Sequence, residues 1–268
     1  MKDAILSLVY PHINIPLVGL DISDRSAKFL KFGTSRKKQT VIDTFGEFDI
    51  PEGLIAKGEI TDEPALTSVF AAWMTKEKRH LKGCYFVISL PEEKSFVRLI
   101  EIPHVKPEEV ANAIRWELEN QIPMPVDEVI FDYEIMTSAA AGQKILNAQM
   151  TAFPKDVIAS YLRTLKGASI APCALELESQ AVVRACIANE DDMSSHIFVD
   201  IGRTRSSIIA YSNGFITYTT TINIGGALFE DHIAKTLNVS TDEATRIKKN
   251  VGLNKKLNGG KVFEALKK

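Results

Sequence analysis

The chain has 268 residues, a formal net charge of −2, 45% hydrophobic residues and 25% charged residues. This length fits one large domain or two modest ones, and the composition is that of an ordinary globular protein. The near-neutral charge excludes a general nucleic-acid binder. The longest apolar runs fall short of the roughly 18 residues that predict a membrane span.

Cysteine and histidine usage points to a cytoplasmic protein without a dedicated metal cage. The three cysteines form no CxxC pair, which favours reduced thiols. The five histidines show no metal-ligand spacing. Residues 1–17 lack the pattern of a signal peptide and predict a packed surface segment, with a short amphipathic lead-in as the alternative.

The first half of the chain predicts an α/β layer. Residues 17–30 read as an apolar strand, a polar turn and a return strand, with Asp21 near the end of the first strand. A third strand over 40–48, a helix over 61–78 and a buried strand over 84–90 follow. Trp73 lies on the apolar stripe of that helix, so we expect it in the core.

Residues 91–153 depart from the pattern of the preceding α/β layer and predict a compact inserted subdomain. A strand over 96–102, a helix over 107–122 and strands over 129–136 and 144–153 make it up. At about 100° per residue, Trp116 falls opposite the apolar stripe of this helix. An outward tryptophan is a candidate partner contact; cover by a neighbouring strand or domain is the alternative.

The chain then predicts a helix over 154–166, a strand over 170–175 and a helix over 176–189. Glu176 and Glu178 lie at the start of that last helix. They are placed to position a water near a phosphate, but exposed glutamates at a helix start are the commoner explanation.

Residues 197–211 repeat the layout of the first hairpin, with Asp200 matching Asp21. Two similar hairpins far apart in one chain predict two related half-domains that face each other across a cleft. Backbone N–H groups and small hydroxyls in such turns hold phosphate, and a carboxylate beside them faces the accompanying metal.

A strand over 215–224 follows, and Gly225-Gly226 opens a helix over 227–237. A diglycine at a helix start allows a ligand close to the backbone, and it is also an ordinary strand-to-helix turn. A further helix runs over 241–250. From Thr241 onward there are eight Lys or Arg residues against three Asp or Glu residues. A solvated basic end is the default interpretation, and contact with an anionic surface is the alternative.

Three motifs resemble those of actin-like ATPases: Gly19-Leu-Asp-Ile, Val199-Asp-Ile-Gly and Ile224-Gly-Gly. The inserted subdomain narrows the resemblance. Its segments Arg98-Leu-Ile-Glu-Ile-Pro, Ile114-Arg-Trp-Glu-Leu-Glu and Gln121-Ile-Pro-Met-Pro-Val-Asp-Glu-Val are similar to the type IV pilus assembly family PilM. The resemblance covers Val18 to Leu253.

The resemblance implies an α/β fold of the actin-like (ribonuclease H-like) type, with two domains and an FtsA-type inserted subdomain. The C-terminal part of domain 2 is expected to be missing. The implied divisions are 1–90 for the first part of subdomain 1A, 91–153 for subdomain 1C, 154–190 for the return to 1A, 191–240 for subdomain 2A and 241–268 for the start of an incomplete 2B.

The implied function is a cytoplasmic ATP-binding scaffold of the pilus inner-membrane platform, at most a weak ATPase. Its implied partner is the N-terminal cytoplasmic tail of the inner-membrane protein PilN, bound beside the inserted subdomain that carries Trp116. ATPases of the pilus machine are further implied partners, and nucleic acid is not one. The protein would reach the inner membrane through its partners.

The resemblance also implies a cofactor site for ATP and Mg²⁺. Asp21 and Asp200 would face Mg²⁺ through water. The first phosphate turn would comprise Ser23, Asp24, Arg25 and Ser26, and the second Gly202, Arg203, Thr204, Arg205 and Ser206. Gly225 and Gly226 would lie at the nucleotide cleft.

The sequence departs from the family pattern in two ways. Ser23 stands where the family usually has glycine, which restricts backbone approach to phosphate. The later glycine-rich motif that receives adenosine is absent, so we expect weaker ATP binding than in a full-length relative and some unpaired apolar surface.

Three other functions are compatible with this fold. The first is a kinase or vigorous ATPase, for which Glu176 and Glu178 are the nearest candidate bases. The second is an FtsA-like division protein that polymerises. The third is a counterpart of the same scaffold in a type II secretion or competence system.

Overall fold

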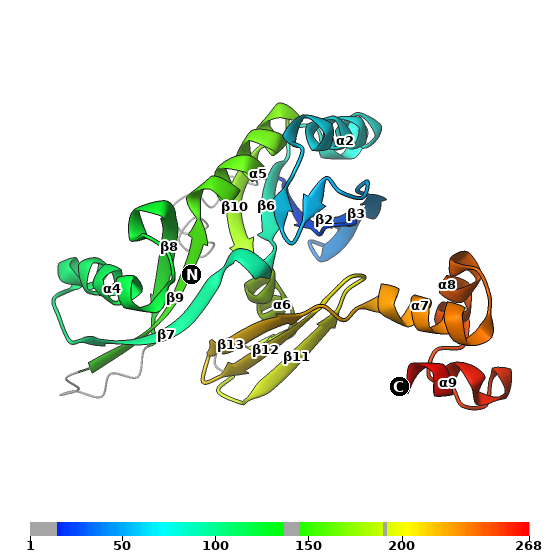
Figure 1. The fold of residues 1–268 in the computed structure, drawn as a ribbon. Helices are drawn as coiled ribbons and strands as arrows, with labels where there is room; N and C mark the ends of the chain where they lie inside the picture. The colour runs from blue at the N-terminus through cyan, green and yellow to red at the C-terminus, as the bar shows by residue number, and fades with distance from the viewer. Residues whose placement is uncertain (1–14, 137–144, 190–191, 268) are drawn as a thin grey trace.

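The computed structural model describes residues 15–136, 145–189 and 192–267, and the expectation for the N-terminal segment lies mostly outside these ranges. The chain forms a five-stranded sheet, a separate inserted subdomain, a three-stranded sheet and a group of C-terminal helices (Figure 1). Within the described ranges, no helix combines the length and the apolar character needed to cross a membrane.

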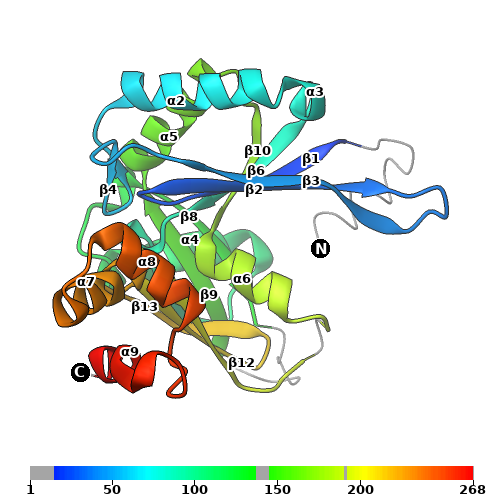
Figure 2. The same ribbon diagram turned by 90° about the vertical axis from the view of Figure 1, so that its right-hand side faces the viewer.

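The five-stranded sheet has the order β10-β6-β1-β2-β3. Strands β1 to β3 form an antiparallel meander, as predicted, whereas β6 and β10 run parallel to β1. Helices α2 and α5 cover one face of the sheet and α6 lies on the other (Figures 1 and 2). The bounds are β1 Leu17–Ile22, β2 Ser26–Thr34, β3 Thr40–Asp49, β6 Tyr85–Leu90, β10 Pro172–Leu177, α2 Glu63–Lys76, α5 Lys155–Gly167 and α6 Glu178–Cys186.

Aromatic packing between α2 and the sheet dominates the main core. Trp73 is 5% exposed, which confirms the prediction that it is a core residue. Its ring stacks on Phe48 with the centroids 4.7 Å apart and meets Phe70 and Phe86 edge-on. Burial of such large rings supplies much of the hydrophobic stabilisation that holds α2 on the sheet.

Short elements connect this layer: β4 Ile55–Ala56, β5 Glu59–Ile60, α3 Lys78–Leu81 and η1 Glu92–Lys94.

The inserted segment has its own sheet, of order β7-β9-β8, and its own core. Helix α4 packs on this sheet through Val110, Ile114 and Leu118, which recur at helical spacing. Trp116 on the opposite face is 75% exposed, as its position on the helix predicts. The bounds are β7 Phe96–Pro103, α4 Pro107–Gln121, η2 Val126–Glu128, β8 Val129–Ile135 and β9 Ile145–Pro154.

The second hairpin opens an antiparallel sheet of order β11-β12-β13. Helix α6 lies between this sheet and the five-stranded one, so Ile209, Tyr211 and Ile216 belong to the main core. Ile197 and Val199 on the edge strand β11 are more than half exposed. The bounds are β11 His196–Ile201, β12 Ser206–Ser212, β13 Phe215–Ile222, α7 Gly226–Leu237, α8 Thr241–Asn250, η3 Asn258–Gly260 and α9 Lys261–Leu266.

The predicted boundary between β10 and α6 is wrong, and α6 also ends at Cys186 instead of residue 189. Strand β10 continues to Leu177, and α6 begins at Glu178 rather than at Glu176. The reason is parallel pairing: Glu176 lies opposite Ser89 and Leu177 opposite Leu90 on β6. Ladder hydrogen bonds to a buried neighbour override the local helical pattern. The predicted domain boundaries stay a prediction.

Candidate functional site

The two hairpin turns have the same backbone design. The N–H of Ser23 donates to the carbonyl of Ser26 at 2.9 Å, and the N–H of Gly202 donates to the carbonyl of Arg205 at 2.9 Å. A Cβ atom on Gly202 would lie 2.9 Å from the Arg205 carbonyl oxygen, so glycine is required there. The first turn has room for a side chain, and the Ser23 hydroxyl itself donates to the Ser26 carbonyl at 2.9 Å.

Asp21 and Asp200 line one cavity of about 290 Å³ between these turns. Hydroxyl and basic side chains of both turns contribute to its wall, and the first turn of α6 closes it. The lining residues are Asp21, Ile22, Ser23, Arg25, Ser26, Lys28, Glu47, Asp49, Glu178, Asp200, Ile201, Gly202, Arg203, Thr204, Arg205 and Ser207.

Carboxylates converge on this cavity. Burial raises the pKa of Glu178 to about 8, and the negative charges of Asp21 and Asp200 add to the rise. Burial also raises the pKa of Asp21, against the opposing effect of Lys28, whose Nζ lies 3.8 Å from the carboxylate. Glu178 is therefore not an exposed glutamate at a helix start, so the commoner explanation is wrong for this residue. Glu176 instead pairs with Arg184, away from the cavity.

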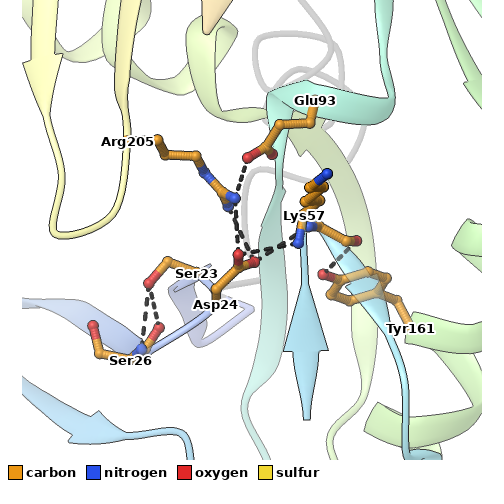
Figure 3. A network of polar contacts seen from close by, with 8 residues as sticks. Ser23, Asp24, Ser26, Lys57, Glu93, Tyr161 and Arg205 are labelled. Carbon is orange, nitrogen blue, oxygen red and sulfur yellow. Dashed lines mark hydrogen bonds and ion pairs between the residues drawn. The ribbon is translucent and has the colours of Figure 1, made fainter. Parts of the chain in front are cut away.

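An ion pair joins the two turns across the cleft (Figure 3). The Arg205 guanidinium of the second turn donates to both carboxylate oxygens of Asp24 in the first turn, at 2.9 and 3.2 Å. Arg205 also pairs with Glu93 of η1. All three side chains are only 14–16% exposed. Bidentate geometry of this kind is the strong form of a charge-assisted hydrogen bond.

The loop that joins β4 and β5 also belongs to this network of polar contacts. Asp24 accepts hydrogen bonds from the backbone N–H groups of Lys57 and Gly58, at 3.1 and 3.2 Å. The buried Tyr161 hydroxyl donates to the Gly58 carbonyl at 3.1 Å. Burial raises the pKa of Glu93, although the charge of Arg205 opposes that rise. The cluster therefore holds two carboxyl groups around one guanidinium.

Nine of the thirteen predicted cofactor-site residues lie on the cavity wall. Four do not: Asp24, Ser206, Gly225 and Gly226. Asp24 is turned toward Arg205 and the Lys57 loop. The buried Ser206 hydroxyl donates to the Ile224 carbonyl at 2.6 Å.

Gly225 and Gly226 allow the backbone at the start of α7 to pack closely against the second turn. A Cβ atom on Gly225 would lie 2.6 Å from the Arg205 nitrogen, so glycine lets α7 approach the second turn. The N–H of Gly226 donates to the Gly202 carbonyl at 2.9 Å, and that of Ala227 to the Arg203 carbonyl at 2.7 Å. These two N–H groups at the start of α7 are thus already engaged.

Gly226 does line a second cavity of about 400 Å³, which shares Ile201, Gly202 and Arg203 with the first. Its floor holds a buried ion pair, with Lys248 Nζ 2.6 Å from Glu230 Oε1. The same Nζ donates to the Gly226 carbonyl at 3.2 Å. Phe229, Thr245 and Lys249 complete the lining.

Sequence reasoning missed several cavity residues, and strand pairing explains most of them. Lys28 lies opposite Asp21 in the ladder of β1 and β2, and Ser207 lies opposite Asp200 in that of β11 and β12. Residues directly opposite in an antiparallel pair share a face of the sheet. Counting across each turn would have found both. Glu47 follows in the same way, opposite Lys28 on β3.

The donor set suits a cation held mainly through water and phosphate. In the described ranges, no group of three His, Cys, Asp or Glu side chains is arranged to hold a metal directly. The carboxylates of Asp21, Asp200 and Glu178 nevertheless repel one another, and a divalent cation would relieve that repulsion. Mg²⁺ keeps several waters and binds through one or two carboxylates plus phosphate oxygens.

Comparison with known proteins decides the family. The model of the family "Type IV pilus assembly protein PilM" matches residues 19–262. The chain belongs to the PilM family. This confirms the resemblance drawn from the inserted segment and assigns the family's role in type IV pilus assembly to this chain.

Solved structures confirm the actin-like fold of this PilM-family chain. A PilM–PilN type IV pilus biogenesis complex has a TM-score of 0.76 at 21% identity, covering 95% of this chain and 73% of that chain. Ethanolamine utilization protein EutJ from Carboxydothermus hydrogenoformans has a TM-score of 0.51 at 16% identity, covering 92% and 64%.

A curated relative supports the similarity of part of this chain to FtsA. Cell division protein FtsA of Bacillus subtilis (strain 168) is 30% identical over 98 residues, which are 37% of this chain and 22% of FtsA. The match thus spans less than a quarter of that relative's length.

We predict that Arg205→Met lowers the free energy of unfolding by about 3–5 kcal/mol, because it leaves two largely buried carboxylates without their cation. Urea unfolding followed by circular dichroism measures this loss. The matched control is Arg163→Met, which removes the surface pair with Glu63, where Arg163 is 61% exposed; its free energy of unfolding should stay close to that of the wild type. Equal losses in the two variants would contradict a structural role for Arg205.

Glu178 should make stability depend on pH. Its pKa is about 8 in the folded chain against an ordinary 4.5, so the folded chain binds a proton that the unfolded chain has lost. This stabilisation is complete below pH 4.5 and disappears as pH rises through 8. Relative to the wild type, Glu178→Gln should therefore gain about 1–3 kcal/mol between pH 5 and pH 9.

Thermal melts at both pH values test this prediction. Glu108→Gln, an exposed glutamate of α4, is the control and should show the same small difference from the wild type at both. A Glu178→Gln variant that behaves like this control would place the carboxyl group in water.

Proposed function

We propose that the chain binds the Mg²⁺ complex of ATP between its two hairpin turns and uses it as a structural or regulatory ligand. The observation that supports this most is the shared cavity, which brings two matching carboxylates together with hydroxyl and basic groups of both turns. Such a set suits a phosphate chain and its cation, because donors meet the phosphate oxygens and carboxylates meet the cation.

Distinct residues would hold the two parts of the ligand. Asp21 and Asp200 would hold Mg²⁺ through its water shell. Arg25, Arg203 and Thr204 would donate to phosphate oxygens, since each lines the cavity. The second cavity shares a wall with the first and has room for the nucleoside. When bound, Mg²⁺ neutralises phosphate charge and orients the phosphate chain.

Without a bound cation, Glu178 would be a poor general base. A general base must be ionised, and near neutral pH a carboxyl group with a pKa of about 8 is largely protonated. A bound cation would lower that pKa and make Glu178 available to orient water. We infer a scaffold with at most weak ATPase activity, in preference to a kinase, because the match to the pilus assembly family favours a scaffold.

The variants Asp21→Asn and Asp200→Asn test the nucleotide proposal by calorimetry. Each should weaken Mg²⁺-dependent ATP binding at least about tenfold, because a cation loses one of its carboxylates. Asp43→Asn on β3 is the control; Asp43 pairs with Lys31 at 2.8 Å and does not line the cavity. ATP binding that is unchanged in both cavity variants would overturn the proposal, and so would ATP binding that is indifferent to Mg²⁺.

We infer further that the chain is a scaffold of the pilus inner-membrane platform and captures the N-terminal cytoplasmic tail of PilN beside the inserted segment. Family membership and the likeness to a PilM–PilN complex support this. The inserted segment has its own core and presents Trp116 at its surface. An FtsA-like polymer is less well supported, since the FtsA match covers 37% of the chain and the PilM model covers residues 19–262.

Trp116→Ala tests the partner contact. We expect it to reduce binding of a PilN N-terminal peptide about tenfold or more, since exposed tryptophans at interfaces are frequent hot spots. Fluorescence anisotropy with a labelled peptide measures it. The control is Ile130→Ala on β8, 50% exposed on the same subdomain. Equal affinity of Trp116→Ala and wild type would remove Trp116 from the interface.

A further inference from the structure

We propose that the turn between α8 and α9 is a contact site for an anionic lipid bilayer. This turn, residues 251–257, has the sequence Val-Gly-Leu-Asn-Lys-Lys-Leu. It lies among the C-terminal helices, at the opposite end of the molecule from the inserted subdomain (Figure 1). The proposal concerns direct contact with lipid, beyond the contact with a membrane protein proposed above.

Two leucines project from this turn. Leu253 is 67% exposed and Leu257 is 43% exposed. The turn is well ordered by its own hydrogen bonds: the N–H of Asn254 donates to the Val251 carbonyl at 3.1 Å, and that of Leu257 donates to the Asn254 carbonyl at 3.2 Å. The backbone therefore holds both apolar side chains outward instead of folding them into the small core beneath.

Lys255 and Lys256 lie between the two leucines in the chain, and further basic residues flank the turn in the sequence. Between residues 246 and 267, six basic side chains are exposed and only one acidic side chain, Glu264, is exposed. None of the six forms an ion pair with a residue that the structure describes; Lys255 lies over the Phe263 ring at 4.3 Å. The six are Arg246, Lys249, Lys255, Lys256, Lys261 and Lys267. Unpaired charge of one sign favours a partner of the opposite sign.

The combination favours a bilayer over a soluble polyanion. Lysines that flank apolar side chains can keep their ammonium groups at the headgroups while the apolar groups enter the interface. A nucleic acid would bind the lysines through its phosphates, but the two leucines would add nothing to its affinity. Proteins that bind single-stranded nucleic acids usually stack the bases on aromatic side chains. Each basic residue near an anionic surface strengthens binding about fivefold. Two leucines and a few lysines therefore give weak, reversible contact.

Vesicle co-sedimentation of the full 268-residue chain tests the proposal, with phosphatidylglycerol–phosphatidylcholine vesicles compared with pure phosphatidylcholine vesicles. The chain should bind only the anionic vesicles, and 0.5 M NaCl should weaken that binding. Lys255→Gln with Lys256→Gln should reduce partition about thirtyfold. Leu253→Gln with Leu257→Gln should reduce it about tenfold.

Matched control pairs lie elsewhere on the surface. Lys78→Gln with Arg79→Gln removes two exposed charges of α3, and Ile42→Gln with Phe45→Gln removes two exposed apolar side chains of β3. Both pairs should partition like the wild type. Because Leu253 and Leu257 are exposed, their variant should keep the wild-type melting temperature, so a loss of vesicle binding would not reflect unfolding.

Three outcomes overturn the proposal. They are equal binding to both kinds of vesicle, a leucine variant that partitions like the wild type, and binding to heparin or single-stranded DNA that matches vesicle binding and ignores the leucines. The last outcome would mean a contact made by charge alone. The experiment contains neither ATP nor PilN, so its failure leaves the proposed function untouched.

Discussion

The ion pair between Arg205 and Asp24 fixes how the two halves of the molecule face each other. It spans 181 residues of sequence and joins the tips of two hairpins whose sheets also share the core around α6. Because desolvation offsets most of the Coulomb attraction, a buried pair adds little net stability, and its main consequence is geometric. It sets the separation of the two turns, and with it the width of the cavity that Asp21 and Asp200 share.

This geometry has an electrostatic consequence. The guanidinium that ties the turns together is already matched by two carboxyl groups, Asp24 and Glu93, so little of its charge remains for a ligand. The cavity wall beyond it carries more carboxylates than free cations. A bare anion would therefore meet net repulsion, whereas an anion that arrives with a divalent cation would meet matching charge on both sides. The cavity would thus discriminate between ligands by charge pattern before any contact with a nucleoside.

The sequence predicted whatever depends on local pattern. Both hairpins, the inserted subdomain, the burial of Trp73 and the outward position of Trp116 follow from periods of two or 3.6 residues. Pairing between distant residues could not be predicted, because an aspartate and an arginine in polar turns usually face water. The sequence named Glu178 as a candidate but favoured an exposed position. Its place depends on a distant pairing, because β10 runs parallel to β6 as far as Leu177 and α6 then begins at Glu178, which lines the cavity.

The inserted subdomain is also tied to the second half of the molecule. The buried side chain of Gln149 on β9 accepts a hydrogen bond from the Ile216 N–H of β13 at 2.8 Å. Strand β13 pairs with β12, which begins directly after Arg205. A change in the separation of the turns must then either move β13 with its contacts to the inserted subdomain or break a buried hydrogen bond, which costs about 1–3 kcal/mol. The sheet that carries the second turn and the sheet on which α4 packs are therefore joined by a buried hydrogen bond.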